Sequence, residues 1–120
     1  MRGLSDNIKV RSIVGRYHEH SRIFYFENSG GEPAVYLGSA DWMQRNFFNR
    51  IECVFPVTSK SLHSTIIYDI LPAFLKDNRE AKVLKSNGAY SLPPANPKEP
   101  RFSAQEYFMA QATALRLDNE

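Results

Sequence analysis

The fold is decided by residues 23–57, which read IFYFENSGGEPAVYLGSADWMQRNFFNRIECVFPV. β-Branched and aromatic residues fill three runs of this stretch, as is typical of β-strands: 23–27, 34–39 and 51–57. Turn-forming residues separate the first two runs, so we expect these to pair as an antiparallel hairpin. The connection at 41–50 predicts a loop with a helical turn, and we expect Pro56 to end the third strand.

Helical periodicity flanks this stretch on both sides. Residues 10–18 are predicted to form a short helix, because Ile13, Val14 and Tyr17 recur at helical spacing. A longer helix is predicted at 59–76, where apolar residues recur at steps of three and four. Because proline lacks a backbone N–H, we expect Pro72 to kink or interrupt that helix.

Two further elements complete the chain. A hairpin is predicted at 81–92 around the two-residue turn Asn87-Gly88. A terminal helix is predicted at 103–117, where Ser103 and Glu106 have the spacing of a capping box. Strands and helices together indicate an α/β (α+β) class. A three-stranded sheet plus a hairpin is small for 120 residues, so we expect the chain to be part of something larger.

The composition is that of a soluble globular protein: 42% hydrophobic, 23% charged, with a formal net charge of +2. A balance so near neutrality does not indicate nucleic-acid binding, so any anion site must come from local clustering of arginine and lysine. The single cysteine, Cys53, is expected to be a buried strand residue in a reducing cytoplasm. Neither a signal peptide nor a transmembrane segment is expected.

The chemically informative residues follow the pattern H-x-R-x4-E…G-S-x-D, formed by His20, Arg22, Glu27, Ser39 and Asp41. On a strand, residues two apart point to the same face. An imidazole can attack phosphorus or shuttle a proton, and a guanidinium beside it can grip phosphate oxygens bidentately. A carboxylate can fix the imidazole tautomer, and a Gly-Ser turn can offer an N–H and a hydroxyl.

Ordinary structural roles stand beside this interpretation. By spacing alone His20 is more readily structural than catalytic. Arg45 and Arg50 can equally pair with Asp41 and Glu52 on the surface, which is the commoner fate of such charges. Other conspicuous side chains are expected to be structural or exposed: Trp42 in the core or a lid, His18, His63, Lys82 and Lys85.

The pattern is close to the H-x-K-x4-D…G-S-x-N motif of the phospholipase D superfamily. Over residues 3–110 the chain resembles, more specifically, the C-terminal region of the long bacterial polyphosphate kinases. The segments that carry this resemblance are NIKVRSIVGRYHEHSRIFYFEN, GGEPAVYLGSADWMQRN and RIECVFPV. It implies that residues 1–120 are an incomplete phospholipase D-like C-terminal catalytic domain, with a mixed sheet and flanking helices.

The resemblance also implies an activity and roles for individual residues. The family moves the terminal phosphate of ATP reversibly to inorganic polyphosphate, using two tandem domains with one motif histidine each. The first histidine becomes phosphorylated, and His20 matches the second, assisting one. Arg50 matches an arginine that contacts the nucleotide phosphates. Four residues match positions near that site and are expected to bind phosphate: Arg22, Ser39, Asp41 and Arg45.

The same resemblance places other parts of the machinery outside this sequence. The nucleophilic histidine and the Mg²⁺ ligands belong to the preceding domain, so no metal site is expected here. The expected partners are ATP, ADP, polyphosphate and the remainder of a homo-oligomeric kinase, in the cytoplasm with membrane association left open. On its own the chain is expected to be inactive. The alternatives are a homodimeric phosphodiesterase of the phospholipase D type and a vestigial structural module.

Overall fold

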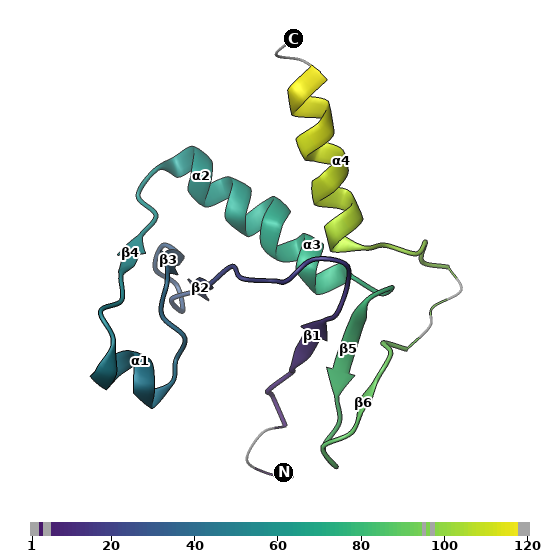
Figure 1. The fold of residues 1–120 in the computed structure, drawn as a ribbon, viewed down its shortest axis with the longest axis horizontal. Coiled ribbons are helices and arrows are strands. Elements are labelled where there is room, and N and C mark those ends of the chain that lie inside the picture. Colours follow the sequence, from purple (N-terminus) through teal and green to yellow (C-terminus); the bar gives the residue numbers. More distant parts are fainter. Residues whose placement is uncertain (1–2, 4–5, 95, 97, 118–120) are drawn as a thin grey trace. The chain divides into compact units, whose positions relative to one another are not determined.

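The computed structural model describes residues 3, 6–94, 96 and 98–117 and confirms the α+β class (Figure 1). The chain divides into two compact units, one formed by residues 20–72 and the other by residues 1–19 with 73–120. In place of one mixed sheet, the described strands form two separate three-stranded sheets, one in each unit, and all their pairings are antiparallel.

The unit 20–72 is built on the sheet β2-β3-β4. Its strands lie within the three predicted runs, as β2 Ile23–Phe26, β3 Ala34–Gly38 and β4 Val54–Pro56. The short helix α1, Gln44–Asn49, provides the helical turn expected between β3 and β4. Val35, at the centre of the sheet, is only 2% exposed, so the middle strand supplies the core of this unit.

The helical stretch from 60 to 76 contains a wider turn. It comprises the α-helix α2 Lys60–Thr65, the π-helical turn η1 Ile66–Ile70 and the α-helix α3 Leu71–Lys76. The Leu71 N–H donates to the Ile66 carbonyl, five residues back, immediately before Pro72. A proline ring crowds the carbonyl four residues earlier, so a wider turn at this point relieves that crowding. The expected irregularity at Pro72 therefore takes the form of a π turn.

The prediction of a helix at 10–18 was wrong. Residues Arg11–Ile13 form strand β1, which pairs antiparallel with β5, Ala81–Leu84. The Val14 N–H continues the pairing by donating to the Glu80 carbonyl at 3.3 Å. These partners lie about 70 residues further along the chain, and pairing of that kind overrides a weak local helical pattern.

The predicted hairpin at 81–92 is present, with β5 pairing to β6, Tyr90–Ser91. Its loop differs in detail from the expected two-residue turn. The Gly88 N–H donates to the Lys85 carbonyl and the Lys85 N–H to the Ala89 carbonyl, so three residues form the loop. Gly88, at φ +83°, occupies the left-handed position that such a loop requires.

The terminal helix α4 spans Ala104–Leu117. As expected of an N-cap, the Ser103 hydroxyl accepts the Glu106 N–H at 3.3 Å. The Glu106 carboxylate instead forms an ion pair with Arg79 at 2.6 Å. Asp77, fully buried, anchors the helix start, because its carboxylate accepts the Ala104 N–H together with the N–H groups of residues 79, 80 and 81. Within the described part of the chain, no helix is both long and apolar enough to cross a membrane.

Candidate functional site

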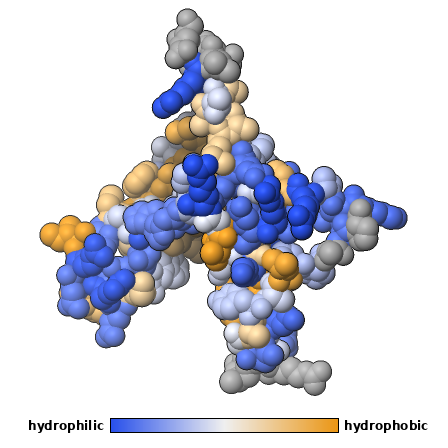
Figure 2. Space-filling model, turned by 45° about the vertical axis from the view of Figure 1, so that its right-hand side comes forward, coloured by the Kyte–Doolittle hydropathy of each residue, from blue (hydrophilic) through white to orange (hydrophobic). Residues whose placement is uncertain are grey.

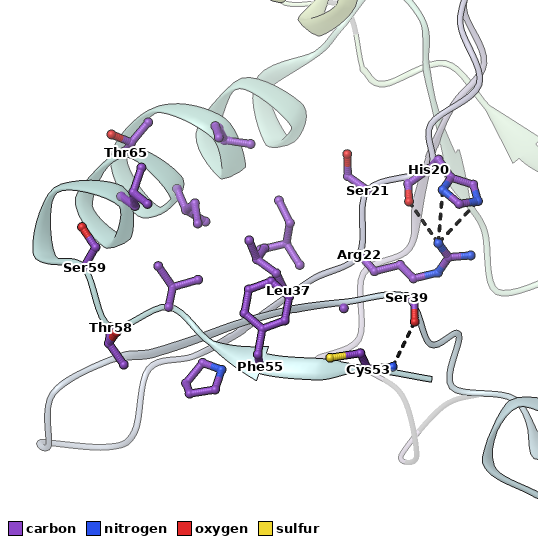
Figure 3. A pocket seen from close by; sticks show the side chains of 17 residues that line it. His20, Ser21, Arg22, Leu37, Ser39, Cys53, Phe55, Thr58, Ser59 and Thr65 are labelled. Atoms are coloured by element: carbon purple, nitrogen blue, oxygen red, sulfur yellow. Dashed lines mark hydrogen bonds between the residues drawn. The ribbon is translucent and has the colours of Figure 1, made fainter. Parts of the chain in front are cut away.

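His20 and Arg22 lie in the segment that leads into β2, and their side chains turn toward one another (Figure 3). The Arg22 Nη1 atom lies 3.3 Å from His20 Nδ1 and 3.5 Å from Nε2, and it also donates to the His20 carbonyl at 3.2 Å. A guanidinium can only donate hydrogen bonds, so the ring nitrogen that faces it must present a lone pair. Both ring nitrogens lie within 3.5 Å of the same guanidinium nitrogen, so either can be the acceptor, according to the tautomer.

Asp41 holds the other edge of the Arg22 guanidinium. Arg22 Nε donates to Asp41 Oδ1 at 2.7 Å, and both side chains are partly exposed. This hydrogen bond lowers the pKa of the Asp41 carboxyl below its ordinary value of 3.8, and partial desolvation opposes the shift. Asn46 and the charge of Arg45 lower it further. The same bond raises the pKa of Arg22, so the two groups stay charged together.

Ser39 directly follows β3 and is hydrogen-bonded to the segment before β4. Its N–H donates to the Cys53 carbonyl at 2.9 Å, and its hydroxyl accepts the Cys53 N–H at 3.1 Å. The Ser39 hydroxyl also donates to Glu52 Oε2 at 2.5 Å. A Cβ on Gly38 would lie 2.7 Å from the Cys53 carbonyl oxygen, so only glycine permits this approach.

Two arginines of the predicted site occupy neighbouring positions. Arg50 pairs with Glu52 through Nε at 3.3 Å, which confirms the surface pairing foreseen for it. Arg45, exposed on α1, lies close enough to Asp41 for its charge to lower the pKa of that carboxyl. Four predicted residues, His20, Arg22, Asp41 and Ser39, thus lie on adjacent strand ends of one sheet.

Glu27 takes no part in this arrangement. It follows β2 at the end opposite to Arg22, about 16 Å away along an extended strand. The carboxylate that contacts the arginine of the motif is Asp41.

Sequence reasoning missed Asn46. Its side chain on α1 is 3% exposed, and its Nδ2 donates to the Asp41 carbonyl at 3.0 Å. Among the described residues, its Oδ1 has no hydrogen-bond partner. The sequence offers no signal for this role beyond a polar residue in a short helix.

A cavity of about 900 Å³ adjoins the His20–Arg22 pair and lies within the unit 20–72. His20, Arg22 and Ser39 line it at one end (Figure 3). The remaining wall is largely apolar and comes from β3, the β4 segment and the helical stretch, with Leu37, Phe55, Val57, Leu62, Ile66 and Ile70. The cavity therefore combines a polar end at His20, Arg22 and Ser39 with a largely apolar wall, and the hydroxyl side chains of Thr58, Ser59 and Thr65 line it on the far side (Figure 3).

Several side chains near the site differ from expectation or refine it. Cys53 is exposed and lines the cavity, so the expectation that it is buried was wrong. It precedes β4, an edge strand with a single neighbour that leaves the thiol uncovered.

Trp42 is 67% exposed and stacks on Phe24. His63 is half-buried and donates to the Pro33 carbonyl at 3.0 Å, while His18 is exposed.

In the residues that the structure describes, no group of three or more histidine, cysteine, aspartate or glutamate side chains could hold a metal ion. The candidate site therefore consists of a histidine, arginines, a serine and two carboxylates, Asp41 and Glu52, each of which is already paired with an arginine. By fold and site, the chain is an α+β protein with cationic and hydroxyl groups gathered at strand ends.

Comparison with known proteins specifies the family. Residues 1–105 match the family model described as polyphosphate kinase C-terminal domain 2. The chain is 56% identical over 88 residues to the polyphosphate kinase of Paraburkholderia phytofirmans, and 48% identical over 112 residues to that of Synechocystis. The chain therefore belongs to the polyphosphate kinase family, and its segment of that family is the C-terminal domain 2.

A solved structure supports the same assignment. The crystal structure of polyphosphate kinase from Porphyromonas gingivalis matches with a TM-score of 0.82 and 40% sequence identity over 92% of this chain. The chain covers 16% of that protein, 13% of the Paraburkholderia kinase and 15% of the Synechocystis kinase. It thus spans only a small part of the length of these relatives.

Proposed function

We propose that this chain contributes one half of the phosphate-transfer site of a polyphosphate kinase. The observation that carries the proposal is the Arg22 guanidinium held between His20 and Asp41, with Ser39 on the adjacent strand end. In this proposal the complete enzyme moves the terminal phosphoryl group of ATP to the end of a polyphosphate chain, reversibly. The remainder of the kinase supplies the histidine that is phosphorylated.

His20 acts on the migrating phosphoryl group as a general acid or base. The ring nitrogen that does not accept from Arg22 can donate a proton or a hydrogen bond to a phosphate oxygen. Arg22, Arg45 and Arg50 neutralise the charge that spreads over the equatorial oxygens. Arg50, whose side chain is 60% exposed, exchanges its Glu52 partner for phosphate, and Glu52 keeps the hydrogen bond that Ser39 donates.

The role of Asp41 in the proposal differs from the expected one. A carboxylate repels phosphate, and Asp41 already accepts a hydrogen bond from Arg22, so we assign it to the support of the site and not to direct phosphate binding. The proposal assigns the Mg²⁺ ligands to the remainder of the kinase. We further propose that the isolated chain is inactive.

The decisive experiment is a chimera in which this chain replaces the matching region of the Paraburkholderia kinase. We expect the chimera to form polyphosphate from ATP and Mg²⁺. His20→Ala should lower the rate by about 100-fold or more, the contribution typical of a general acid or base. His18→Ala is the matched control, because it removes an exposed histidine two residues away. A His20→Ala chimera with near wild-type rate would contradict the role of His20.

The isolated chain provides the second test. We expect no turnover with ATP, Mg²⁺ and polyphosphate, but binding of polyphosphate that weakens steeply with salt, because each phosphate contact releases counterions. Turnover that His20→Ala abolishes would instead favour a self-sufficient enzyme such as the homodimeric phosphodiesterase. Absence of binding even at low salt would favour a structural module.

A further inference from the structure

Two residues other than His20, Asp41 and Asn46, form a chain of hydrogen bonds that ends at Arg22. Asp41 accepts the Arg22 Nε–H at 2.7 Å, and Asn46 donates to the Asp41 carbonyl at 3.0 Å. The Met43 N–H donates to the same carbonyl at 2.7 Å. Asp41 is thereby fixed through its backbone at the turn that leads into α1, and its carboxylate faces the strand end that carries Arg22.

Asn46 is an unusual residue to find in this position. It is the one buried residue of α1, and its Oδ1 has no hydrogen-bond partner among the described residues. A buried amide oxygen without a partner lowers stability, so such a group calls for a compensating role. Its Nδ2 donates to the Asp41 carbonyl, and its side chain, like that of Arg22, also lowers the pKa of the Asp41 carboxyl, so the contacts of this amide converge on Asp41.

We propose that Asn46 and Asp41 are positioning residues, which act through Arg22 to aim its Nη1 atom at the His20 ring. The order of contacts is Asn46 to Asp41, Asp41 to Arg22, and Arg22 to His20. Because Nε is bound by Asp41, the guanidinium cannot rotate freely about its last bond, and its Nη edge stays toward the site. This inference rests on the proposed function, since it assigns Arg22 to phosphate binding.

The substitution Asp41→Asn distinguishes a positioning residue from a nearby negative charge, because the two roles predict opposite changes in the affinity for phosphate. Asp41→Asn removes a negative charge from a phosphate site, which by Coulomb's law alone would tighten anion binding. If Asp41 positions Arg22, the same substitution weakens binding. We expect about fivefold weaker binding of inorganic tripolyphosphate, measured by calorimetry on the whole chain. Glu27→Gln, the same charge change at the far end of β2, is the control and should not weaken binding.

Asn46→Ala tests the first contact without changing any charge. We expect it to weaken tripolyphosphate binding about threefold, whereas Asn49→Ala, the exposed asparagine of the same helix, should leave binding unchanged. In an Arg22→Ala background, Asp41→Asn should no longer weaken binding, because the guanidinium that Asp41 positions is absent. Tighter or unchanged binding by Asp41→Asn in the wild-type background would overturn the inference.

The experiment separates failure of the inference from failure of the proposed function. If Arg22→Ala leaves tripolyphosphate binding unchanged, the phosphate site itself is wrong. If Arg22→Ala weakens binding while Asp41→Asn and Asn46→Ala do not, only the positioning role is wrong.

A readout without ligand keeps the inference testable if the isolated chain binds poorly. The Arg22 Nε–H signal in NMR spectra should exchange slowly in the wild-type chain and faster in Asn46→Ala, although Asp41 keeps its charge there. An unchanged exchange rate in Asn46→Ala would overturn the positioning role of Asn46.

Discussion

At the scale of single residues, the Arg22–Asp41 ion pair determines the protonation state of the Asp41 carboxyl. Because Arg22 lowers the pKa of Asp41, the folded chain binds a proton at this carboxyl less readily than the unfolded chain does. The stabilisation from the pair is therefore complete above the ordinary carboxyl pKa of 3.8 and is lost as the pH falls through the lowered value. At neutral pH the carboxylate and the guanidinium are both charged.

This linkage gives a prediction for stability. Asp41→Asn should lower the urea midpoint by roughly 0.3 M at pH 7, and the difference from wild type should disappear as the pH falls below the carboxyl range. The measurement is a set of urea unfolding curves at stepped pH. Glu27→Gln, the charge-matched control, should show no comparable pH dependence of the difference. If the difference in urea midpoint between wild type and Asp41→Asn grew as the pH fell, the Arg22–Asp41 pair would not be its cause.

Spacing on a strand predicted that His20 and Arg22 share a face, and the resemblance to the polyphosphate kinases implied that Ser39, Asp41, Arg45 and Arg50 belong to the same site. It could not assign their partners. The pattern includes two carboxylates, Glu27 and Asp41, without saying which one serves the site, and β2 separates Glu27 from Arg22. Asn46 was missed because its role depends on burial and on one backbone carbonyl, neither of which a pattern of residue types records.

At the scale of secondary structure, the predictable elements were those with strong local patterns. β2, β3 and the helical stretch 60–76 follow from alternation and from steps of three and four. β1 was mistaken for a helix because its strand character comes from pairing with β5, far along the chain. Pro72 predicted an irregular helix. The π geometry of residues 66–70 depends on which N–H groups donate to the carbonyls before the proline, and sequence alone does not give these partners.

The β5–β6 loop offers a test of backbone conformation alone. Gly88 has φ +83° and no heavy atom within 4 Å of an added Cβ, so substitution meets strain but no clash. Gly88→Ala should destabilise the chain by about 1 kcal/mol, and Gly88→Asn by less, because asparagine tolerates the left-handed region better. Chemical unfolding measures both. Ser86→Ala in the same loop is the control, and an equal loss there would rule out the conformational cause.

At the scale of the whole molecule, many large apolar side chains are exposed. Figure 2 shows orange, apolar side chains among blue ones on the face that it presents. Phe48 is 77% exposed and Ile51 is fully exposed, and the cavity beside His20 has largely apolar walls. Apolar surface of this kind commonly marks an interface. It accords with a chain that spans only 13–16% of its relatives.

We therefore expect the isolated chain to bind the dye ANS and to self-associate at high concentration. Phe48→Ser combined with Ile51→Ser should reduce both effects roughly twofold without altering the far-UV circular dichroism. Light scattering and dye fluorescence are the measurements. Asn49→Ser, which changes an exposed polar residue between the two, serves as the control. Unchanged self-association in the double variant would exclude these two side chains as its cause.

The exposed thiol of Cys53 has a practical consequence. It is the single cysteine of the sequence and it lines the cavity close to Ser39, to which its N–H is bonded. A maleimide fluorophore or a spin label would therefore attach at one defined position, with no engineered cysteine and no second thiol to block. The emission of the fluorophore, or the line shape of the spin label, would report directly on whether a ligand enters the cavity between β4 and the helical stretch.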